Sequence, residues 1–396
     1  MEDQMNEPMP ELFIVDQLRA SLRQLMVVEE VKVLSNDAKP PVQFTGHLLE
    51  GDEETVFDEI VQRFAALGYT PLLTLVDGEH RLQAIPAVPD GKTGKPWINY
   101  LLFGLTLLST LFVGAFHENI IPSRLTDIWR GWPFALTLLA ILTAHELSHY
   151  FVGRHYGSPV SLPYFIPLPL PGSLGTLGAV IFQRGPMRSR KALFDIGVAG
   201  PIGGLIIAIP LLILGLSLSK VGTPYAFMDV PKGEPLEVMQ EGNSILYLAA
   251  KYVVHGRILP DKATGEDVWL SPPSAGGSIA FAAWVGLLVT MFNLFPIGQL
   301  DGGHVAYAMW GQKAWKIARI MLAAIWGWGI LLLLRQNYGG MTWLMIGSLG
   351  LFIGPRHAPP LNDVTLLDAR RKMLGWVMVV IFFLLLVPIP WMTVTL

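Results

Sequence analysis

Two histidines flank a glutamate in one apolar stretch of the chain: His145, Glu146 and His149 lie within AHELSHY. Residues four apart share one face of a helix, so the two imidazoles converge on a single point. Neutral imidazole binds zinc, and a glutamate placed between such histidines reaches a metal-bound water without being a ligand. Keeping these polar groups in an apolar span is costly unless a partner such as a metal holds them. The pattern therefore predicts a zinc-dependent hydrolytic site with Glu146 as its catalytic residue.

A zinc site normally takes three protein ligands, so a third must come from another part of the chain. The chain has no cysteine, which leaves imidazole and carboxylate as donors. Asp301 is the candidate, because it ends a later apolar segment, NLFPIGQLDGGH at residues 293–304. Pro296 breaks that helix, so we expect Asp301 on irregular backbone inside protein or a wet cavity. Taken alone, Asp301 is equally well a loop acid, and His304 is not expected to be a ligand.

The composition is that of a membrane protein. Hydrophobic residues make up 52% of the 396 residues and charged residues 15%, against roughly one quarter charged in soluble domains. The formal charge of -3 offers no basic excess, so nucleic acid is excluded as a partner. The acidic N-terminus, MEDQMNEPMPEL, has no visible signal peptide.

Apolar segments about as long as a bilayer core recur from Trp97 onward, and they lack the polar face of soluble helices. Because the sixth is short, we predict a mainly α fold, a polytopic membrane helical bundle of about six to seven spans. The segments lie near residues 98–116, 131–152, 194–218, 276–297, 316–334, 341–354 and 373–391.

Residues 1–92 contain no apolar run long enough to span a bilayer, and we interpret them as a small soluble α/β domain. The pattern predicts a strand at Val42–Leu49, a helix over Glu53–Leu67, and a hairpin that pairs Leu72–Val76 with His80–Ala84 across Asp77-Gly78. A linker at Pro89–Pro96 would separate this domain from the membrane-embedded domain, residues 93–396. A stabilising or adaptor domain without chemistry is the simplest role for it.

Basic residues orient the array by the positive-inside rule. A cytosolic N-terminus places every basic loop cluster inside and leaves the loops at 117–130 and 220–275 outside, the latter with a helix near Ser244–Val254. The sequence thus predicts a multi-pass protein of a bacterial plasma membrane, with the N-terminus and the active site towards the cytosol. The inside clusters are Arg154, Arg184, Arg188, Arg190 and Lys191, then Lys313 and Lys316, then Arg370, Arg371 and Lys372.

Two motifs on separate spans, HELSH at 145–149 and NxxPxxxLDG at 293–302, together resemble the site-2 protease family of intramembrane zinc metalloproteases. The resemblance covers roughly residues 95–390. The segments GTLGAVI at 175–181, FDIGVAGP at 194–201 and RHAPPLND at 356–363 are similar to the branch found in bacteria, cyanobacteria and plastids.

This resemblance implies a zinc endopeptidase with a three-helix core at 131–152, 194–218 and 276–297, whose substrates are membrane proteins cleaved within or beside the bilayer. Zinc lowers the pKa of its bound water towards about 7, and Glu146 would accept the proton and later deliver it to the leaving amine. Asn293 of the family motif would donate to the oxyanion or the substrate carbonyl, although capping of the helix end explains it equally well. We expect one Zn²⁺ per chain. The oligomeric state cannot be derived from the sequence.

The proline-rich segment at 163–172 and the apolar run to Phe182 suit extended chain. A strand edge there would pair with an unwound substrate, and a structural hairpin is the equal alternative. Two other functions compete with the protease: a catalytically dead relative, which the presence of Glu146 disfavours, and a transporter, which would show repeated broken helices.

Overall fold

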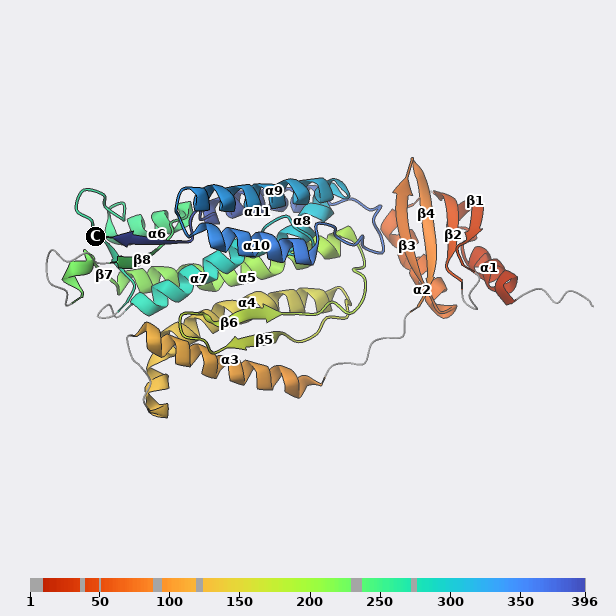
Figure 1. The fold of residues 1–396 in the computed structure, drawn as a ribbon. Helices are drawn as coiled ribbons and strands as arrows, with labels where there is room; N and C mark the ends of the chain where they lie inside the picture. The colour runs from red at the N-terminus through yellow and green to blue at the C-terminus, as the bar shows by residue number, and fades with distance from the viewer. Residues whose placement is uncertain are drawn as a thin grey trace, which may run out of the picture. The chain divides into compact units, whose positions relative to one another are not determined.

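The computed structural model describes residues 10–35, 40–49, 51–87, 95–118, 124–228, 237–271 and 276–395. The extreme N-terminus and most of the predicted linker lie outside these residues. The chain divides into two compact units (Figure 1). The N-terminal unit comprises Met1–Thr93, Arg184–Leu193 and Ala358–Asp368, and the helical unit comprises Gly94–Gln183, Phe194–His357 and Ala369–Leu396.

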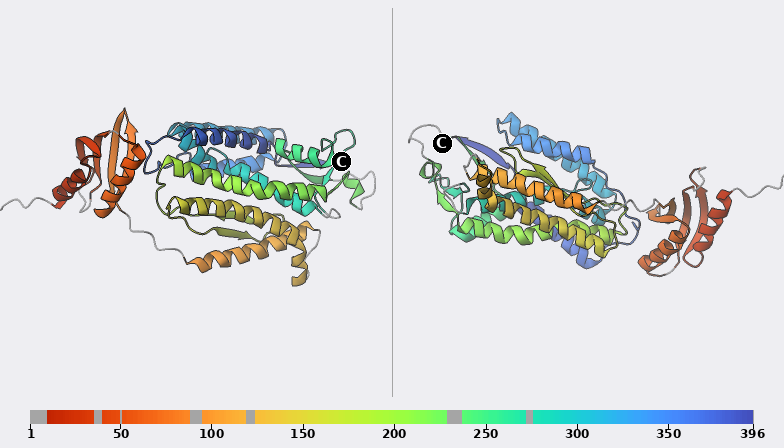
Figure 2. Two further views of the ribbon diagram at one scale, coloured as in Figure 1. Left: turned by 180° about the vertical axis from the view of Figure 1, so that it is seen from behind. Right: turned by 90° about the horizontal axis from the view of Figure 1, so that it is seen from below.

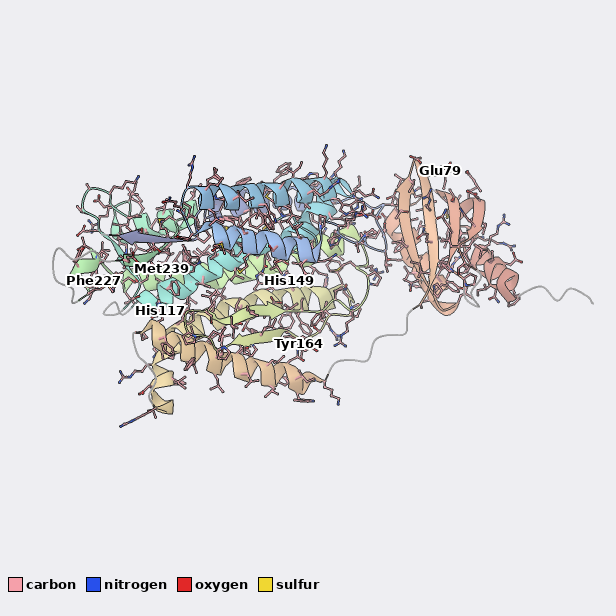
Figure 3. All side chains as sticks on the ribbon, viewed as in Figure 1. Glu79, His117, His149, Tyr164, Phe227 and Met239 are labelled. Carbon is pink, nitrogen blue, oxygen red and sulfur yellow. The ribbon has the colours of Figure 1, made fainter. Side chains whose placement is uncertain are left out.

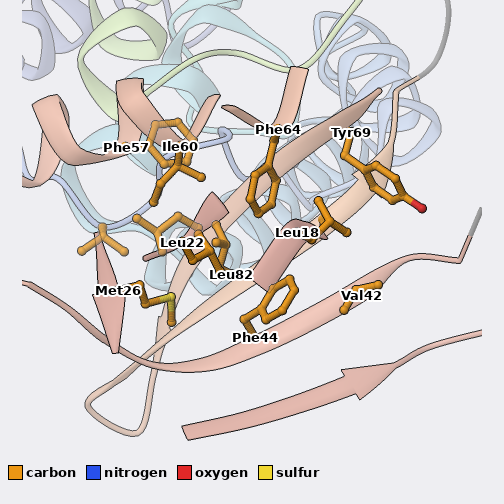
Figure 4. Packing of buried hydrophobic residues seen from close by; sticks show 13 residues of the cluster. Leu18, Leu22, Met26, Val42, Phe44, Phe57, Ile60, Phe64, Tyr69 and Leu82 are labelled. Carbon is orange, nitrogen blue, oxygen red and sulfur yellow. The ribbon is translucent and has the colours of Figure 1, made fainter. Parts of the chain in front are cut away.

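The N-terminal unit is a four-stranded antiparallel sheet with strand order β1-β2-β4-β3 and two helices. A single apolar core lies between the sheet and the helices, with Phe57 and Phe64 of α2 and Phe44 of β2 at its centre (Figure 4). The elements are α1 (Pro10–Ser21), β1 (Met26–Val33), β2 (Val42–Leu48), α2 (Glu53–Ala66), β3 (Tyr69–Val76) and β4 (Glu79–Pro86).

The predicted α/β character of this region is confirmed. Helix α2 begins where Asp52 accepts a hydrogen bond from the backbone N–H of Thr55, at 3.2 Å. The predicted hairpin is present as β3 and β4, and Asp77 and Gly78 both have positive φ, 54° and 88°, as a tight two-residue turn requires. Helix α1 and strand β1 were not predicted from the sequence.

Two later segments of the chain complete the N-terminal unit. The backbone N–H of Leu73 in β3 donates to Leu361, and the N–H of Asp363 donates back to Leu73, so this short segment pairs with β3 through one parallel β-bridge, Leu73 with Asn362. Ion pairs join the stretch before and at the start of α5 (Arg190–Ser217) to the same unit. They are Arg188–Asp58 at 2.6 Å, Arg190–Asp363 at 2.8 Å and Lys191–Glu54 at 2.5 Å.

The helical unit is a bundle of long apolar helices (Figure 2). Each of the seven predicted apolar segments forms a helix, which confirms the mainly α fold. Among the described residues, four helical stretches are long and apolar enough to cross a membrane: Pro96–His117, Thr126–His155, Arg190–Ser217 and Lys313–Leu334. The count of six to seven spans stays a prediction. The helices are α3 (Pro96–His117), α4 (Trp132–His155), α5, α7 (Gly277–Asn293), α8 (Asp301–Trp310), α9 (Lys313–Leu334), α10 (Gly340–Ile353) and α11 (Ala369–Leu385).

A β-hairpin lies between α4 and α5 in the chain, where the prolines predicted extended backbone. Strands β5 (Tyr164–Leu168) and β6 (Gly175–Val180) pair antiparallel, with an irregularity between Phe165 and Pro167. The hydroxyl of Ser109 in α3 donates to the carbonyl of Gly175 at 2.6 Å, which anchors β6 to that helix.

At one end of the bundle, short strands and α6 (Ile245–His255) form a cap (Figures 1 and 2). Strand β7 (Lys220–Gly222) pairs with β9 (Asp267–Trp269), and β8 (Glu237–Glu241) pairs with the C-terminal strand β10 (Trp391–Thr395). Helix α6 falls where the sequence predicted one. Its Lys251 is fully buried and lies 3.3 Å from Glu241 and 2.9 Å from Asp267.

Candidate metal centre

Helix α4 carries the predicted motif on a face that points into the bundle. His145, Glu146 and His149 are buried, with 4%, 6% and 5% of their surface exposed, and Figure 3 shows His149 among the helices. Since each turn of the helix advances 3.6 residues, the two histidines are stacked one turn apart. Helix α4 therefore presents both imidazoles to the same interior space.

Asp301 closes this space from α8. Its carboxylate oxygens lie 3.2 Å from Nε2 of His145 and 3.2 Å from Nε2 of His149. The two Nε2 atoms are themselves 3.2 Å apart. Among the described residues, His145, His149 and Asp301 form a buried group that could hold a metal ion.

These distances fit zinc. Ligand atoms bound at about 2.0–2.1 Å in a tetrahedral site stand about 3.3 Å from one another, close to the spacing of the three residues. Nδ1 of His149 lies 2.7 Å from the carbonyl oxygen of Ile196 and donates its proton there, so Nε2 presents a lone pair. Oδ2 of Asp301 is buried without a hydrogen-bond donor among the described residues. Electron-rich atoms this close repel one another unless a cation lies between them.

The carbonyl of Ile196 is a part of the site that the sequence did not predict. It fixes the tautomer and the ring plane of His149, as outer hydrogen bonds to metal-ligating histidines do. Backbone groups leave no residue-type signature, so only the spatial meeting of α4 and α5 reveals it.

Gly200 of α5 was also missed as a site residue. A Cβ atom at this position would stand 2.0 Å from Nε2 of His149, so only glycine leaves room for the imidazole. A Cβ atom at Gly197 would similarly stand 2.8 Å from Cβ of His304. The small residues of AGPIGG at 199–204 are the available sequence signal, because small residues allow close packing of membrane helices.

Two further predicted positions lie close to the group. The side-chain amide of Asn293, at the end of α7, is 3.3 Å from Nε2 of His145. His304 does not join the three residues. Its Nδ1 is 2.5 Å from Nε2 of His357.

One expectation about Asp301 was wrong. The residue is not on irregular backbone but is the first residue of helix α8. Pro296 and Gly298 do interrupt the helix between α7 and α8. A new helix then begins directly after Leu300, which adopts the extended conformation that precedes a helix. An acidic side chain in the first turn is favoured by the helix dipole.

Comparison with known proteins places this geometry in a family. The model of Peptidase family M50 matches residues 133–334, about half of the chain. The chain belongs to peptidase family M50. The match includes α4 with its two histidines, α5, α7 and the start of α8, so the residues brought together in space all lie within it.

Curated proteins similar to the chain include plant proteins. The chain is 26% identical over 312 residues to "Probable zinc metalloprotease EGY2, chloroplastic" of Arabidopsis thaliana, which covers 76% of this chain and 50% of the relative. It is 30% identical over 259 residues to "Probable zinc metalloprotease EGY1, chloroplastic" of Arabidopsis thaliana, with 65% and 43% covered. The chain thus spans half or less of the length of these relatives. No solved structure matches it.

Membership in family M50 confirms the resemblance to the site-2 proteases, and the chloroplastic relatives agree with the predicted branch. The printed names of these relatives describe zinc metalloproteases, which agrees with the predicted class and with zinc as the predicted metal.

Proposed function

We propose that this chain is an intramembrane endopeptidase that hydrolyses peptide bonds of membrane-protein substrates within or next to the bilayer. The observation that carries the proposal is the buried convergence of His145, His149 and Asp301 beside Glu146. Both histidines and Glu146 lie in a helix long and apolar enough to span a membrane. In this proposal the first three residues hold zinc, and Glu146 moves protons.

Bound zinc would acidify a water molecule and polarise the scissile carbonyl. Glu146 stands beside the ligands but outside the ligand group, so its carboxylate is free to accept the proton that the attacking water gives up. The resulting carboxylic acid then protonates the leaving amine. Burial of Glu146 keeps bulk water from taking over either transfer.

Asn293 is the proposed donor to the developing oxyanion. Its amide already reaches Nε2 of His145 at 3.3 Å, so it borders the space where a substrate carbonyl would lie. An amide placed there stabilises charge that appears only during the reaction, which lowers the barrier to hydrolysis.

The β5–β6 hairpin is the proposed docking edge for the unwound substrate. A helical substrate exposes no peptide bond to attack until its backbone is extended, and an edge strand holds such a backbone by main-chain hydrogen bonds. Leu177 and Phe182 are exposed on this segment, which suits an apolar substrate sequence. The anchoring of β6 to α3 keeps the edge rigid.

We further propose a two-domain protein, with a soluble domain at 1–92 and a membrane-embedded protease domain at 93–396. The latter would have seven spans, formed by α3, α4, α5, α7, α9, α10 and α11, around a core of α4, α5 and α7. The contacts of Arg188 with Asp58 and of Leu361 with Leu73 require all three segments to lie on one side of the membrane, so an even number of spans must separate them. The proposed arrangement meets this condition. The basic residues favour the cytosolic side. In a plastid, the stroma would take its place.

Reporter fusions at Lys92 and Arg188 test this topology. Both positions should report the same, cytosolic side of a bacterial plasma membrane, because Arg188 pairs with a residue of the N-terminal domain. Opposite sides would show that the span count or the placement of the active site is wrong.

A Glu146→Gln variant tests the function itself. Glutamine keeps the size and polarity of the side chain but cannot accept a proton, so cleavage should fall by roughly two to four orders of magnitude while zinc stays bound. Membrane-protein fragments would be quantified in cells carrying wild type or the variant, and zinc per chain measured on the purified protein. Glu79→Gln, an exposed change in the N-terminal unit, is the matched control. Undiminished cleavage by Glu146→Gln would refute the mechanism.

A further inference from the structure

One carboxylate joins three helices at the edge of the catalytic core. Asp195 of α5 receives two parallel hydrogen bonds from Arg371 of α11, from Nε to Oδ1 at 2.9 Å and from Nη2 to Oδ2 at 2.6 Å. The hydroxyl of Tyr156, the residue that ends α4, also donates to Asp195. Nη2 of Arg371 reaches the same hydroxyl at 3.2 Å. We name Tyr156, Asp195 and Arg371 the α4–α5–α11 clamp.

The clamp is linked to the metal centre through two of its three helices, α4 and α5. Asp195 directly precedes Ile196, whose carbonyl accepts the Nδ1 proton of His149 at 2.7 Å. Tyr156 follows His149 by seven residues, two turns of α4, so both side chains lie on the same face of that helix. The clamp and the hydrogen bond from His149 to Ile196 therefore lie in the same interface between α4 and α5.

The clamp constrains the relative orientation of the helices it joins, as well as their separation. A bidentate pair between guanidinium and carboxylate fixes the angle as well as the distance between its partners. Burial and the neighbouring Asp195 carboxylate raise the pKa of the Tyr156 hydroxyl, so it remains protonated and acts as a donor. The side chains of Arg371 and Asp195 are 29% and 24% exposed, so the network lies at the rim of the bundle.

We propose that Asp195, held by Tyr156 and Arg371, is a positioning residue for the metal centre. It sets the register of α5 against α4 so that the Ile196 carbonyl meets His149 and the imidazole keeps Nε2 aimed at His145 and Asp301. The inference rests on the proposed function, since it assigns a role to residues that hold the zinc ligands in place. None of the three clamp residues belongs to the group that could hold the metal.

The test is retention of zinc by the purified full-length protein, measured as the rate at which zinc passes to an excess of chelator. Arg371→Gln removes the bidentate pair. The matched control is Arg370→Gln, because Arg370 is exposed and its substitution removes the same charge from the same helical turn. Zinc loss should be roughly tenfold faster in Arg371→Gln, the low end of the effect of groups that orient metal ligands, and unchanged in Arg370→Gln. Arg371→Lys, with a single ammonium, should fall between.

Tyr156→Phe removes one hydroxyl and serves as a milder second test in case the arginine variant misfolds. It should speed zinc loss by a smaller factor, and the double variant with Arg371→Gln should lose zinc more slowly than the product of the two single effects. Unchanged zinc loss in both clamp variants, or equal losses in Arg371→Gln and Arg370→Gln, would overturn the inference alone. A wild type that holds no zinc would overturn the proposed metal centre, and the inference with it.

Discussion

Substitution of Gly200 by alanine is the smallest change that should empty the metal centre. The added Cβ would lie 2.0 Å from Nε2 of His149 and 2.5 Å from its Cε1, whereas ordinary contact begins at 3.4 Å. The imidazole or the α5 backbone must therefore withdraw by about 1.4 Å. Metal–ligand distances tolerate roughly 0.2 Å, so a displacement several times larger removes His149 from the coordination sphere.

The magnitude follows from what is lost. Mutation of groups that merely orient a ligand costs roughly 10- to 100-fold in metal affinity. Displacement of a ligand itself should exceed 100-fold, which corresponds to more than about 2.7 kcal/mol of binding free energy. Zinc per chain in purified Gly200→Ala should therefore fall far below one after brief exposure to a mild chelator, and cleavage should disappear with it.

Gly204→Ala is the matched control on the same helix. Its Cβ would stand 3.4 Å from Nδ1 of His145, which is ordinary contact, so this variant should keep its zinc. Membrane yield and thermal midpoint of both variants establish that the fold persists. A Gly200→Ala protein that folds and resists the chelator as wild type does would refute the assignment of His149 Nε2 as a metal-binding atom.

Two further predictions concern separate parts of the molecule. The double variant His145→Ala, Asp301→Ala should bind almost no zinc by metal analysis, because one histidine alone cannot build a site, and near-stoichiometric zinc would contradict the ligand assignment. Lys251→Met should lower stability at neutral pH by about 3–5 kcal/mol, since it leaves Glu241 facing Asp267 without the ammonium. Burial raises the pKa of Glu241 above its usual range, and a protein with such a carboxyl gains stability as the carboxyl takes up its proton. Thermal midpoints of this variant should therefore move towards those of wild type on acidification, and an unchanged gap would show that the carboxylates carry no net charge conflict.

The mainly α fold and the group that could hold a metal were accessible from the sequence because their signals are local. Long apolar segments predict membrane helices, and the helical spacing of His145 and His149 predicts a metal site. Asp301 followed from its place at the end of an apolar segment. Its backbone conformation was misjudged because Pro296 shows where a helix ends but not how soon the next one begins.

The parts that escaped sequence reasoning depend on contacts between distant segments. The Ile196 carbonyl has no side-chain signature, and Gly200 is one of many glycines until its distance from His149 is known. Strand β1 was missed because an irregularity between Val28 and Glu30 interrupts the alternation that predicts strands.

The pairing of Leu361–Asp363 with β3 has a consequence for biosynthesis. Residues 1–93 leave the ribosome early, and their sheet then has an open edge at β3, the kind of edge that pairs with other chains. The segment that covers it, Ala358–Asp368, is made only after α10, when all but the last of the long apolar helices have been synthesised. In the proposed topology, the N-terminal sheet can close only in chains whose intervening helices have returned to the starting side of the membrane. A closed sheet would then indicate correct insertion of the helices between its parts.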